Sequence, residues 1–395
     1  MPAPQTASAS QMSPAQQAAM QNSQARQTII TNAVKMSQQV LTTTITPFSS
    51  AGNAVANVLN VQPRYAGLIL GFVIEIVAII TNTSAGALSL SVLNAANILS
   101  NITLTDLNNN QRINTAGWHL MAVNTVRARR PFGSSVATDS PIGFGSNLTP
   151  ISAPSTIAAS STGTVKMCYY VPCSYGPHDL RGAIYANVTN ATMQLGLTFN
   201  PAFCVATGAD ATLAGYSGNA AGYISSASVV VNQVYYSQLP VDAKTGPILP
   251  LQDLATIYEL KSTALTGLAV GQDFPYPYAN FRQFLSTTAI YDNGGTLNAG
   301  TDINYFALQA ANYTNIFKED VTKYALDCRA MIGTDTPKGM YIFETRDKPL
   351  QTNQYGNLEL LINPSSVGAN SQALYGTEAF ALINQVSNAG SLAAG

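Results

Sequence analysis

The stretch 236-YSQLPVDAKTGPILPLQDLATIYEL-260 divides the chain into two halves. Pro240, Gly246, Pro247 and Pro250 exclude a continuous strand or helix through its first part. Its second part, 251–260, carries apolar side chains at helical spacing, which predicts a short helix. Strand-like sequence precedes the stretch, ending with 227–236, and more strand-like sequence follows it. The chain is therefore predicted to consist of two β-rich units joined by a stiff connector.

The composition is rich in apolar residues and poor in charge. The 395 residues can form two or three domains, and 46% are hydrophobic, enough for a large core. Only 9% are charged, against about 25% in ordinary globular proteins. Disorder is excluded as the reason, because disordered chains are rich in charge and poor in β-branched residues. The remaining explanations are a surface of neutral polar residues or extensive burial against copies of the same chain, since interface centres are depleted in charge.

The charges are unevenly placed along the chain. Through Tyr235 there are nine basic and five acidic residues, and from Tyr236 onward nine basic and fourteen acidic. Arg26, Lys35 and Arg64 precede the first acidic residue, Glu75. This imbalance is too small for a nucleic-acid-binding protein, but it suits the N-terminal end to an anionic surface.

Several sequence features bear on the compartment. The first 25 residues lack the apolar central region of a signal peptide. The longest apolar run, 66–80, contains Glu75 and is shorter than the roughly 20 residues of a membrane span. Four cysteines in a chain of this length do not make a disulfide framework. We therefore expect synthesis in a reducing, cytosolic compartment.

The N-terminal segment predicts a mobile arm followed by a helix. Residues 1–12 have the composition of an arm. Ser13, Pro14 and Gln16 then form a capping-box pattern. Small apolar residues continue at helical spacing and predict a helix from Pro14 to about Leu41. Two roles stay open for it: packing on its own domain or a neighbour, or contact with a membrane.

Strand patterns dominate the rest of the chain. In Tyr65–Thr81 apolar residues alternate, and the second face is also mostly apolar, so both faces are expected to be covered. Further strands are predicted at Gly117–Val126, Thr164–Val171, Met193–Phe199, Ala227–Tyr236, Phe284–Asp292, Gly339–Thr345, Asn357–Asn363 and Leu374–Val386. Helices are predicted at 302–313 and 319–332. Segments 131–163 and 200–226 are predicted to lack regular structure and to serve subunit contacts or an exposed crown. Many strands with few helices favour sandwiches, jelly rolls or barrels.

Catalytic and metal-binding patterns are weak. The chain has only two histidines, His119 and His178, and no G-x-S-x-G nucleophile elbow between a strand and a helix. His119 is expected to be a structural residue in a strand. Cys168, Cys173 and His178 are too widely spaced for a typical zinc site, so buried reduced cysteines are favoured over zinc.

Two loops are candidates for ion or anion binding. Residues 292–302 have the composition of a calcium loop but carry Ile303 where the loop glutamate belongs. A tight turn at Gly294 and Gly295 is favoured over a cation site. The basic cluster Arg127, Arg129 and Arg130 ends a predicted strand before Pro131. It is interpreted as a subunit-contact or solvated loop, with an anion or nucleic-acid contact as the alternative.

Short motifs along the chain carry a family resemblance. They are Gly117–His119, Val123–Thr125, Thr138–Ile142, Ala153-Pro154, Thr156–Ala159, Leu239-Pro240, Ile248–Leu251, Asp253-Leu254, Tyr278–Asn280, Leu285–Thr287, Asp292–Gly295, Asn298–Tyr305, Pro337–Gly339, Arg346–Pro349 and Gln354–Asn357. In this order, over most of residues 13–385, they resemble the major capsid protein of tectiviruses, the tailless icosahedral phages with an internal membrane.

The resemblance implies two eight-stranded jelly rolls side by side, mainly β, with an N-terminal helix and a few short helices. Adenovirus hexon shares this architecture. The expected division is 1–43 for the arm and helix, 44–240 for the first jelly roll, 241–262 for the connector, 263–386 for the second jelly roll and 387–395 for a tail.

The resemblance also implies partners. Homotrimers with a six-sided outline would tile an icosahedral shell around an internal membrane. They would contact neighbouring trimers and the vertex (penton) and minor capsid proteins, after synthesis in the host bacterial cytoplasm. The N-terminal helix would lie toward the membrane, which makes Arg26 and Lys35 candidate membrane-facing residues. No enzymatic activity, cofactor, metal or specific nucleic acid is implied.

A second hypothesis is a β-sandwich adhesin or spike with a carbohydrate site. Its stacking platforms would be Tyr216, Tyr223, Tyr276 and Tyr278. An enzyme is the least favoured class, because titratable groups are few.

Overall fold

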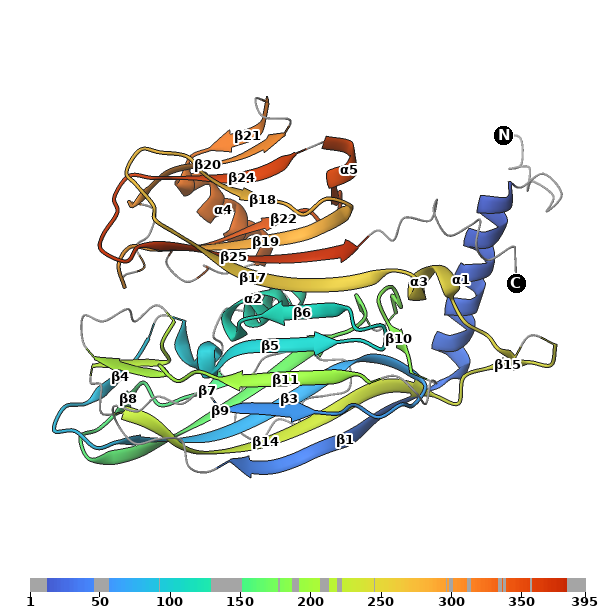
Figure 1. Ribbon diagram of the computed structural model, residues 1–395, viewed down its shortest axis with the longest axis horizontal. Coiled ribbons are helices and arrows are strands. Elements are labelled where there is room, and N and C mark those ends of the chain that lie inside the picture. The colour runs from blue at the N-terminus through green and yellow to red at the C-terminus, as the bar shows by residue number, and fades with distance from the viewer. Residues whose placement is uncertain are drawn as a thin grey trace.

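The computed structural model describes residues 13–45, 57–91, 93–128, 151–176, 178–186, 192–206, 213–218, 222–244, 246–295, 297, 301–310, 314–332, 336, 339–355 and 357–381. These residues are mainly β-strand, with an N-terminal helix and a few shorter helices, which confirms the predicted fold class. Two β-domains lie side by side, and their long strands run along the same direction (Figure 1). We call β1–β14 the first β-domain and β17–β25 the second.

The N-terminal helix α1 (Pro14–Asn32) begins as predicted and ends early. The Ser13 hydroxyl accepts the Gln16 N–H, and the Gln16 side chain accepts the Ser13 N–H, so the capping box is present. The predicted end near Leu41 is wrong. Ala33 is extended, and β1 (Val34–Ile45) begins next and pairs with β14 (Gly222–Ser237). A bulge between Gln39 and Leu41 breaks the strand alternation, which explains the helix-like spacing of apolar residues here.

The first β-domain is built from two facing sheets. One has the order β1-β14-β3-β9-β7, with β10 beside β3. Its further strands are β3 (Leu68–Asn82), β7 (Ile151–Ser152), β9 (Ser161–Pro172) and β10 (Ile184–Tyr185). The facing sheet contains β2 (Val58–Val61), β5 (Leu99–Thr105), β6 (Gln111–Thr115) and β11 (Gln194–Phe199), and the 3₁₀ helix η2 (Asn94–Ile98) leads into β5.

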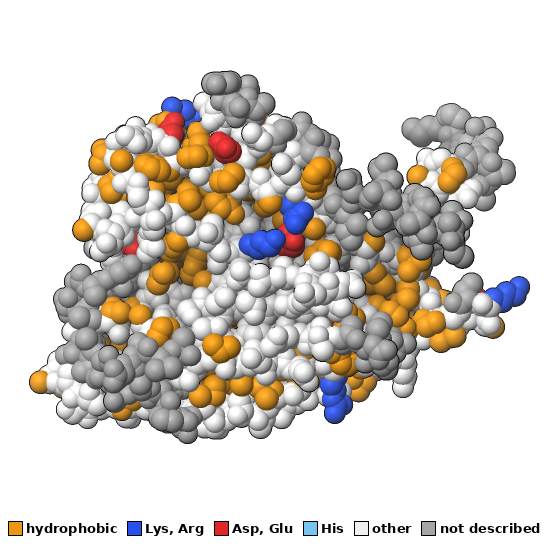
Figure 2. All heavy atoms as spheres, viewed as in Figure 1, with side chains coloured by type: hydrophobic (Ala, Val, Ile, Leu, Met, Phe, Trp, Pro, Cys, Tyr) orange, Lys and Arg blue, Asp and Glu red, His pale blue; other side chains and the backbone are white. Residues whose placement is uncertain are grey.

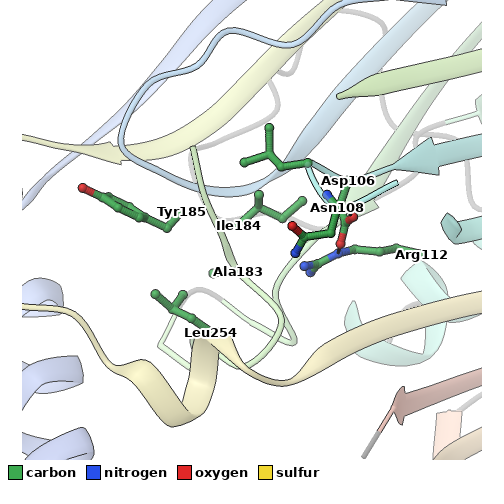
Figure 3. A pocket seen from close by; sticks show the side chains of 8 residues that line it. Asp106, Asn108, Arg112, Ala183, Ile184, Tyr185 and Leu254 are labelled. Carbon is green, nitrogen blue, oxygen red and sulfur yellow. Dashed lines mark hydrogen bonds and ion pairs between the residues drawn. The ribbon is translucent and has the colours of Figure 1, made fainter. Parts of the chain in front are cut away.

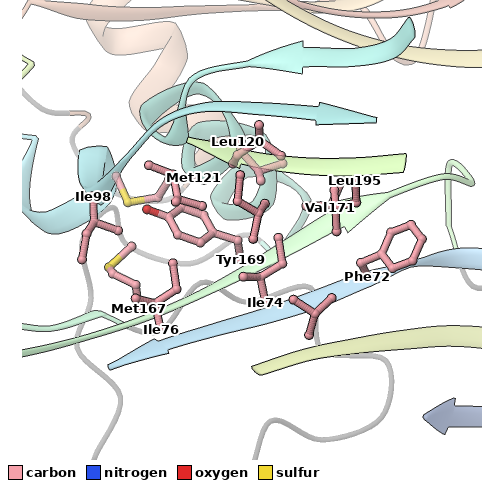
Figure 4. Packing of buried hydrophobic residues seen from close by; sticks show 14 of the residues in the cluster. Phe72, Ile74, Ile76, Ile98, Leu120, Met121, Met167, Tyr169, Val171 and Leu195 are labelled. Carbon is pink, nitrogen blue, oxygen red and sulfur yellow. The ribbon is translucent and has the colours of Figure 1, made fainter. Parts of the chain in front are cut away.

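The core of this domain lies between the two sheets. Alternate residues of β3, including Phe72, Ile74 and Ile76, are buried against residues of β9 and β11 (Figure 4). The Tyr169 hydroxyl donates to the Ala96 carbonyl at 2.5 Å, so the largest polar group in this layer is satisfied. Each such apolar side chain contributes about 1.5–3 kcal/mol on burial. The buried row along β3 is therefore a large part of what stabilises this domain.

The predicted strand Gly117–Val126 is wrong, because this segment is the helix α2 (Gly117–Ala128). Almost every side chain of α2 is buried. A helix covered on all sides shows no single apolar stripe, so its sequence lacks the 3.6-residue signal of a surface helix.

The connector is short and irregular. It contains the two-stranded ladder of β15 (Val241–Asp242) and β16 (Gly246–Pro247), and then α3 (Leu251–Leu254), which confirms the predicted short helix. β17 (Ile257–Thr266) already begins inside the stretch 241–262 that was predicted to be connector. The helical spacing of apolar residues predicted a helix as far as Leu260, but α3 ends at Leu254 and β17 begins at Ile257.

The second β-domain also has two facing sheets. On one side are β17, β19 (Arg282–Asp292), β22 (Met340–Glu344), β23 (Leu350–Gln351) and β25 (Gln372–Ala381). On the other are β18 (Phe274–Pro277), β20 (Ile303–Ala310), β21 (Thr314–Glu319) and β24 (Leu358–Pro364), with α4 (Val321–Ile332) and α5 (Thr352–Tyr355). Aromatic rings fill the space between them, with Phe306 against Tyr341 and Phe343.

One sheet runs through both domains. β6 pairs with β17 in parallel, through Leu260 opposite Ile113 and Lys261 opposite Asn114. This joint makes a nine-stranded sheet with the order β2-β11-β5-β6-β17-β25-β19-β22 and β23 beside β19. The Ser262 hydroxyl accepts the Ala116 N–H at 2.9 Å next to the joint. The two domains are therefore linked by backbone hydrogen bonds as well as by the connector.

Most of the remaining predictions can be compared with the structure. The strands predicted within 65–81, 164–171, 193–199, 227–236, 284–292, 339–345 and 357–363 are confirmed, as is a helix within 319–332. The strand 374–386 is confirmed as far as Ala381, and the rest lies outside the described residues. The helix predicted at 302–313 is wrong: β20 occupies 303–310, and a bulge between Ile303 and Tyr305 disturbs its alternation.

The two segments predicted to lack regular structure are partly ordered into strands. β8 (Thr156–Ile157), β12 (Cys204–Ala206), β13 (Tyr216–Gly218) and β4 (Leu88–Leu90) form a four-stranded sheet at the end of the first domain away from α1 (Figure 1). Residues 131–150, 207–212 and 219–221 of these segments lie outside the described residues. This sheet forms because short segments that are far apart in the sequence pair with one another. The local sequence of each segment does not predict such pairing.

The surface carries little charge. Figure 2 shows one face on which charged side chains are few and lie in small separate groups, with broad areas between them that carry no charge. Within one chain the second face of β3 is covered only in part: Leu68 and Leu70 are buried, whereas Val77 and Ile79 are each 40% exposed. The described surface thus has few charged side chains, as the composition predicts, and some of its exposed side chains are apolar.

Candidate functional site

The helix α2 lies in the seam between the two β-domains. Trp118 and Ala122 pack against Ile290, Met340 and Leu374 of the second domain. Leu120, Met121 and Val123 belong to the core of the first domain. One helix thus completes both cores, and the seam is a buried interior and not a cleft.

A buried ion cluster crosses this seam. Glu378 of β25 is fully buried and accepts from Arg127 at 2.5 Å and from Arg346 at 2.5 Å. Tyr258 and Ser286 donate their hydroxyls to the same carboxylate at 2.7 and 2.9 Å. Arg127 is the last basic residue of α2, so the cluster joins a first-domain helix to three strands of the second domain.

The electrostatics of the cluster follow from burial and from the two arginines. Burial alone would raise the pKa of Glu378, but Arg127 and Arg346 hold it well below its ordinary value. Burial raises the pKa of Glu344 to about 7, although Arg346 donates to it at 2.6 Å. Several arginine N–H groups of the cluster, including Nε of both Arg127 and Arg346, have no partner within the described part of the chain. Removing any one charged partner from this cluster would leave an uncompensated buried charge and would destabilise the fold.

His119 lies on α2 and not in a strand, next to Trp118. Its ring is fully buried, and Nδ1 lies 2.7 Å from the Thr115 hydroxyl. Burial lowers its pKa to about 4 despite the nearby Glu378 carboxylate, so the ring is neutral at pH 7. A Cβ added at Gly376 would lie 2.1 Å from His119 Cδ2, so the ring fills the space that a glycine leaves. These contacts agree with a structural histidine.

A second polar cluster attaches α1 to the connector. Arg26 donates to both oxygens of Asp253, from Nε at 2.6 Å and from Nη2 at 2.7 Å. The Asn22 side chain donates to Asp253 at 3.0 Å and accepts the Gln252 N–H at 2.9 Å. Ile29 is buried below this cluster with Leu68, Leu70, Val234 and Tyr236. Only the second half of α1 has buried residues, and the part Pro14–Gln21 is exposed.

A small pocket opens beside this attachment (Figure 3). Its volume is about 250 Å³, and Asp106, Asn108, Arg112, Ile184 and Leu254 are among its lining residues. Arg112 donates to Asp106 at 2.6 Å and to the Gly182 carbonyl at 2.7 Å. The arginine charge is balanced within the chain, so this pair fixes the β5–β6 loop to the segment before β10.

Of the five residues singled out by the sequence, Arg26, Lys35 and Arg127 are described, and they lie in three different places. Arg26 is paired with Asp253, and Lys35 is half-buried on β1, where burial lowers its pKa. Arg127 lies on the helix α2 and not in a loop, and its side chain, 7% exposed, pairs with Glu378. Arg129 and Arg130 lie outside the described residues. Asp253 and Glu378 were missed, because their partners are 227 and 251 residues away in sequence.

The other candidates are structural. Tyr216 is fully buried against Phe203, Tyr278 is buried, and Tyr276 stacks on Tyr375 at 4.6 Å, so these rings are wrong as sugar platforms. Tyr223 is half-buried. Cys168 and Cys173 are buried free thiols, as predicted. Gly294 and Gly295 have positive φ and Asp292 accepts the Gly295 N–H, as the predicted tight turn requires.

Within the described part of the chain, His, Cys, Asp and Glu side chains do not gather into a group of three or more that could hold a metal ion. Among the described helices, none is long and apolar enough to span a bilayer. The two ion clusters join distant elements of the chain, α1 to α3 and α2 to β25.

Comparison with known proteins identifies the family. Residues 7–238 match the P3 major capsid protein N-terminal family, and residues 255–394 match the P3 major capsid protein C-terminal family. The chain is 41% identical over 395 residues to the major capsid protein P3 of Enterobacteria phage PRD1, covering 97% of this chain and 98% of that protein.

Solved structures agree at the level of the fold. The STIV MCP crystal structure has a TM-score of 0.62 at 11% identity and covers 90% of this chain and 98% of that chain. A chain in the atomic structure of Sulfolobus Turreted Icosahedral Virus has a TM-score of 0.61 at 12% identity, with coverage of 90% and 93%. Such neighbours are double jelly-roll capsid proteins. This chain therefore belongs to the P3 family of major capsid proteins, and it is a coat protein of the tectivirus type with a double jelly-roll fold.

Proposed function

We propose that the chain forms homotrimers with a pseudo-hexagonal outline, and that these trimers tile an icosahedral shell around an internal lipid membrane. The observation that carries this proposal is the whole-chain similarity to a tectivirus major capsid protein, 41% over 97% of the sequence. A charge-poor surface supports it, because each copy would lose surface to its trimer partners and again to neighbouring trimers.

The end of the molecule that carries α1 faces the membrane in this proposal. α1 lies at one end of the long strands (Figure 1), where its C-terminal part packs on the first β-domain, and Pro14–Gln21 is exposed. Pro14–Gln21 contains no charged residue, so it can approach a bilayer surface at low desolvation cost. Arg26 and Lys35 lie next along the chain and remain the proposed membrane-facing cations, although Arg26 also pairs with Asp253.

The remaining roles follow from the same proposal. Vertex (penton) and minor capsid proteins would complete the shell, and the protein would be made in the host bacterial cytoplasm without binding nucleic acid specifically. It would have no enzymatic activity. We also propose that the chain divides into an arm with helix (1–43), two jelly rolls (44–240 and 263–386), a connector and a tail, with β1 packed into the first roll.

A deletion tests the membrane assignment. Removing residues 1–32 takes away the arm and α1 but keeps β1, which the sheet of the first domain needs. We expect the truncated protein to sediment as a trimer and to lose binding to vesicles of phosphatidylglycerol and phosphatidylethanolamine. A truncated protein that no longer forms trimers would place α1 in the trimer contact instead. Full-length protein that sediments as a stable monomer at micromolar concentration would overturn the trimer itself.

A further inference from the structure

The sheet of the first β-domain has an outward face that is only partly covered. On its central strand β3, Glu75, Val77 and Ile79 point outward and are exposed, while Ile74, Ile76 and Ala78 are buried in the core. Val77 pairs with Ser228 of β14 and with Lys166 of β9, both exposed. We call the outward residues of three strands the outer face: 73–81 of β3, 162–170 of β9 and 226–232 of β14.

One end of the outer face is already covered by the chain itself. Ile29 of α1 packs on Leu68, Leu70 and Val234, which continue the outward rows of β3 and β14. Farther along β3 the described part of α1 no longer covers this face, and the β-branched residues Val77 and Ile79 are each 40% exposed. Val77 and Ile79 are neighbours on this face of β3, and contiguous exposed apolar area is a feature of surfaces that contact partners.

Charge on the outer face is sparse and of both signs. Glu75 and Lys166 are its charged residues, and they lie on neighbouring strands one pair apart, since Glu75 is opposite Cys168 and Val77 opposite Lys166. Neither has an ion-pair partner among the residues that the structure describes. Two such surfaces, each with one cation and one anion among uncharged residues, can pack together without placing like charges opposite each other.

The strand at the border of this face supports the same partner. β1 is the edge strand of the sheet and has twelve residues without proline, of which six are exposed and six half-buried. Long unprotected edges attract a second chain unless they are covered. A coat protein meets copies of itself at high local concentration, so a second copy is the occupant that the edge and the face both fit.

We propose that the outer face of β14, β3 and β9, with the β1 edge, is a contact surface between neighbouring copies of this chain. The proposal rests on the proposed function, because it names the surface through which the copies meet. It favours a second copy over a lipid surface, since the outer face runs along the strands and not across the end that carries α1 (Figure 1).

Paired lysine substitutions in the full-length chain test the surface. In Val77→Lys/Ile79→Lys, two unpaired charges would enter the contact. We expect the apparent dissociation constant of the trimer, or the critical concentration for joining trimers into larger shells, to rise at least about a hundredfold. The matched control is Val270→Lys/Leu326→Lys, two apolar residues of the second domain that are 59% and 60% exposed. The control should assemble within about threefold of the unmodified protein.

A second measurement separates assembly from folding. Hydroxyl-radical footprinting of unmodified protein should show Val77 and Ile79 protected on assembly and Val270 unchanged. The surface assignment is overturned if the Val77/Ile79 variant assembles like the control, or if the footprint at these residues is the same in both states. It is also overturned if their protection appears only when vesicles are added. If the unmodified protein forms no oligomer at all, it is the proposed function that fails.

Discussion

Replacing Glu378 with glutamine should destabilise the fold far more than an equivalent change at the surface. The carboxylate is fully buried and accepts from Arg127, Arg346, Tyr258 and Ser286. An amide keeps the shape, but its NH₂ group must face at least one of these donors. Arg127 then loses its carboxylate partner Glu378, and Arg346 keeps only Glu344. Removing one partner of a buried ion pair costs about 3–5 kcal/mol, so we expect a loss of at least about 3 kcal/mol.

The assay is urea unfolding at fixed protein concentration, followed by tryptophan fluorescence, because Trp118 lies on α2 in the same seam. The matched control is Glu359→Gln on β24, whose carboxylate has no ion-pair partner among the described residues. It should change the free energy of unfolding by less than about 0.5 kcal/mol. Adding Arg346→Gln to Glu378→Gln should recover part of the loss, because the cluster regains charge balance, and the coupling should be about 1–3 kcal/mol. Equal effects of Glu378→Gln and Glu359→Gln would refute the reasoning.

Three further outcomes are expected. His119 is buried with a pKa of about 4 against 6.5 in the unfolded chain, so its stabilising contribution is lost as pH falls from 6.5 to 4; His119→Asn should reduce that pH dependence by up to about 3 kcal/mol in urea titrations at both pH values. Gly376→Ala should lower the free energy of unfolding by about 1–3 kcal/mol through its clash with His119, whereas Gly176→Ala, where no atom lies within 4 Å, should be neutral. Asp253→Asn should loosen α1 and raise the rate of tryptic cleavage after Arg26 severalfold on gels, and an unchanged rate would contradict the attachment.

Local patterns predicted the elements whose environment is simple. The burial of β3 alternates from Phe72 onward because one face is core, and Ser13 to Gln16 encode a capping box that needs only neighbouring residues. The failures have tertiary causes. Bulges at Gln39/Leu41 in β1 and at Ile303/Tyr305 in β20 shift the alternation by one residue and imitate helical spacing. α2 is enclosed on all sides, so its sequence has no polar face to set a period.

The ion clusters could not be predicted, for a different reason. Arg127 was visible as part of a basic cluster, but its partner Glu378 is an isolated acid in a β-strand 251 residues later. Asp253 likewise looked like an ordinary residue of a short helix, while its partners Asn22 and Arg26 lie on the N-terminal helix. A single sequence contains no signal that links such residues, because only the folded topology brings them together.

The parallel joint between β6 and β17 has a mechanical consequence. Since one hydrogen-bonded sheet crosses from the first roll to the second, we expect the two rolls to move as one body and not about a hinge. When a closed coat bends to follow its own curvature, the strain cannot be absorbed inside the molecule. Bending must instead take place where separate molecules touch, so the angle between neighbours, and with it the diameter of the finished particle, is decided at those boundaries.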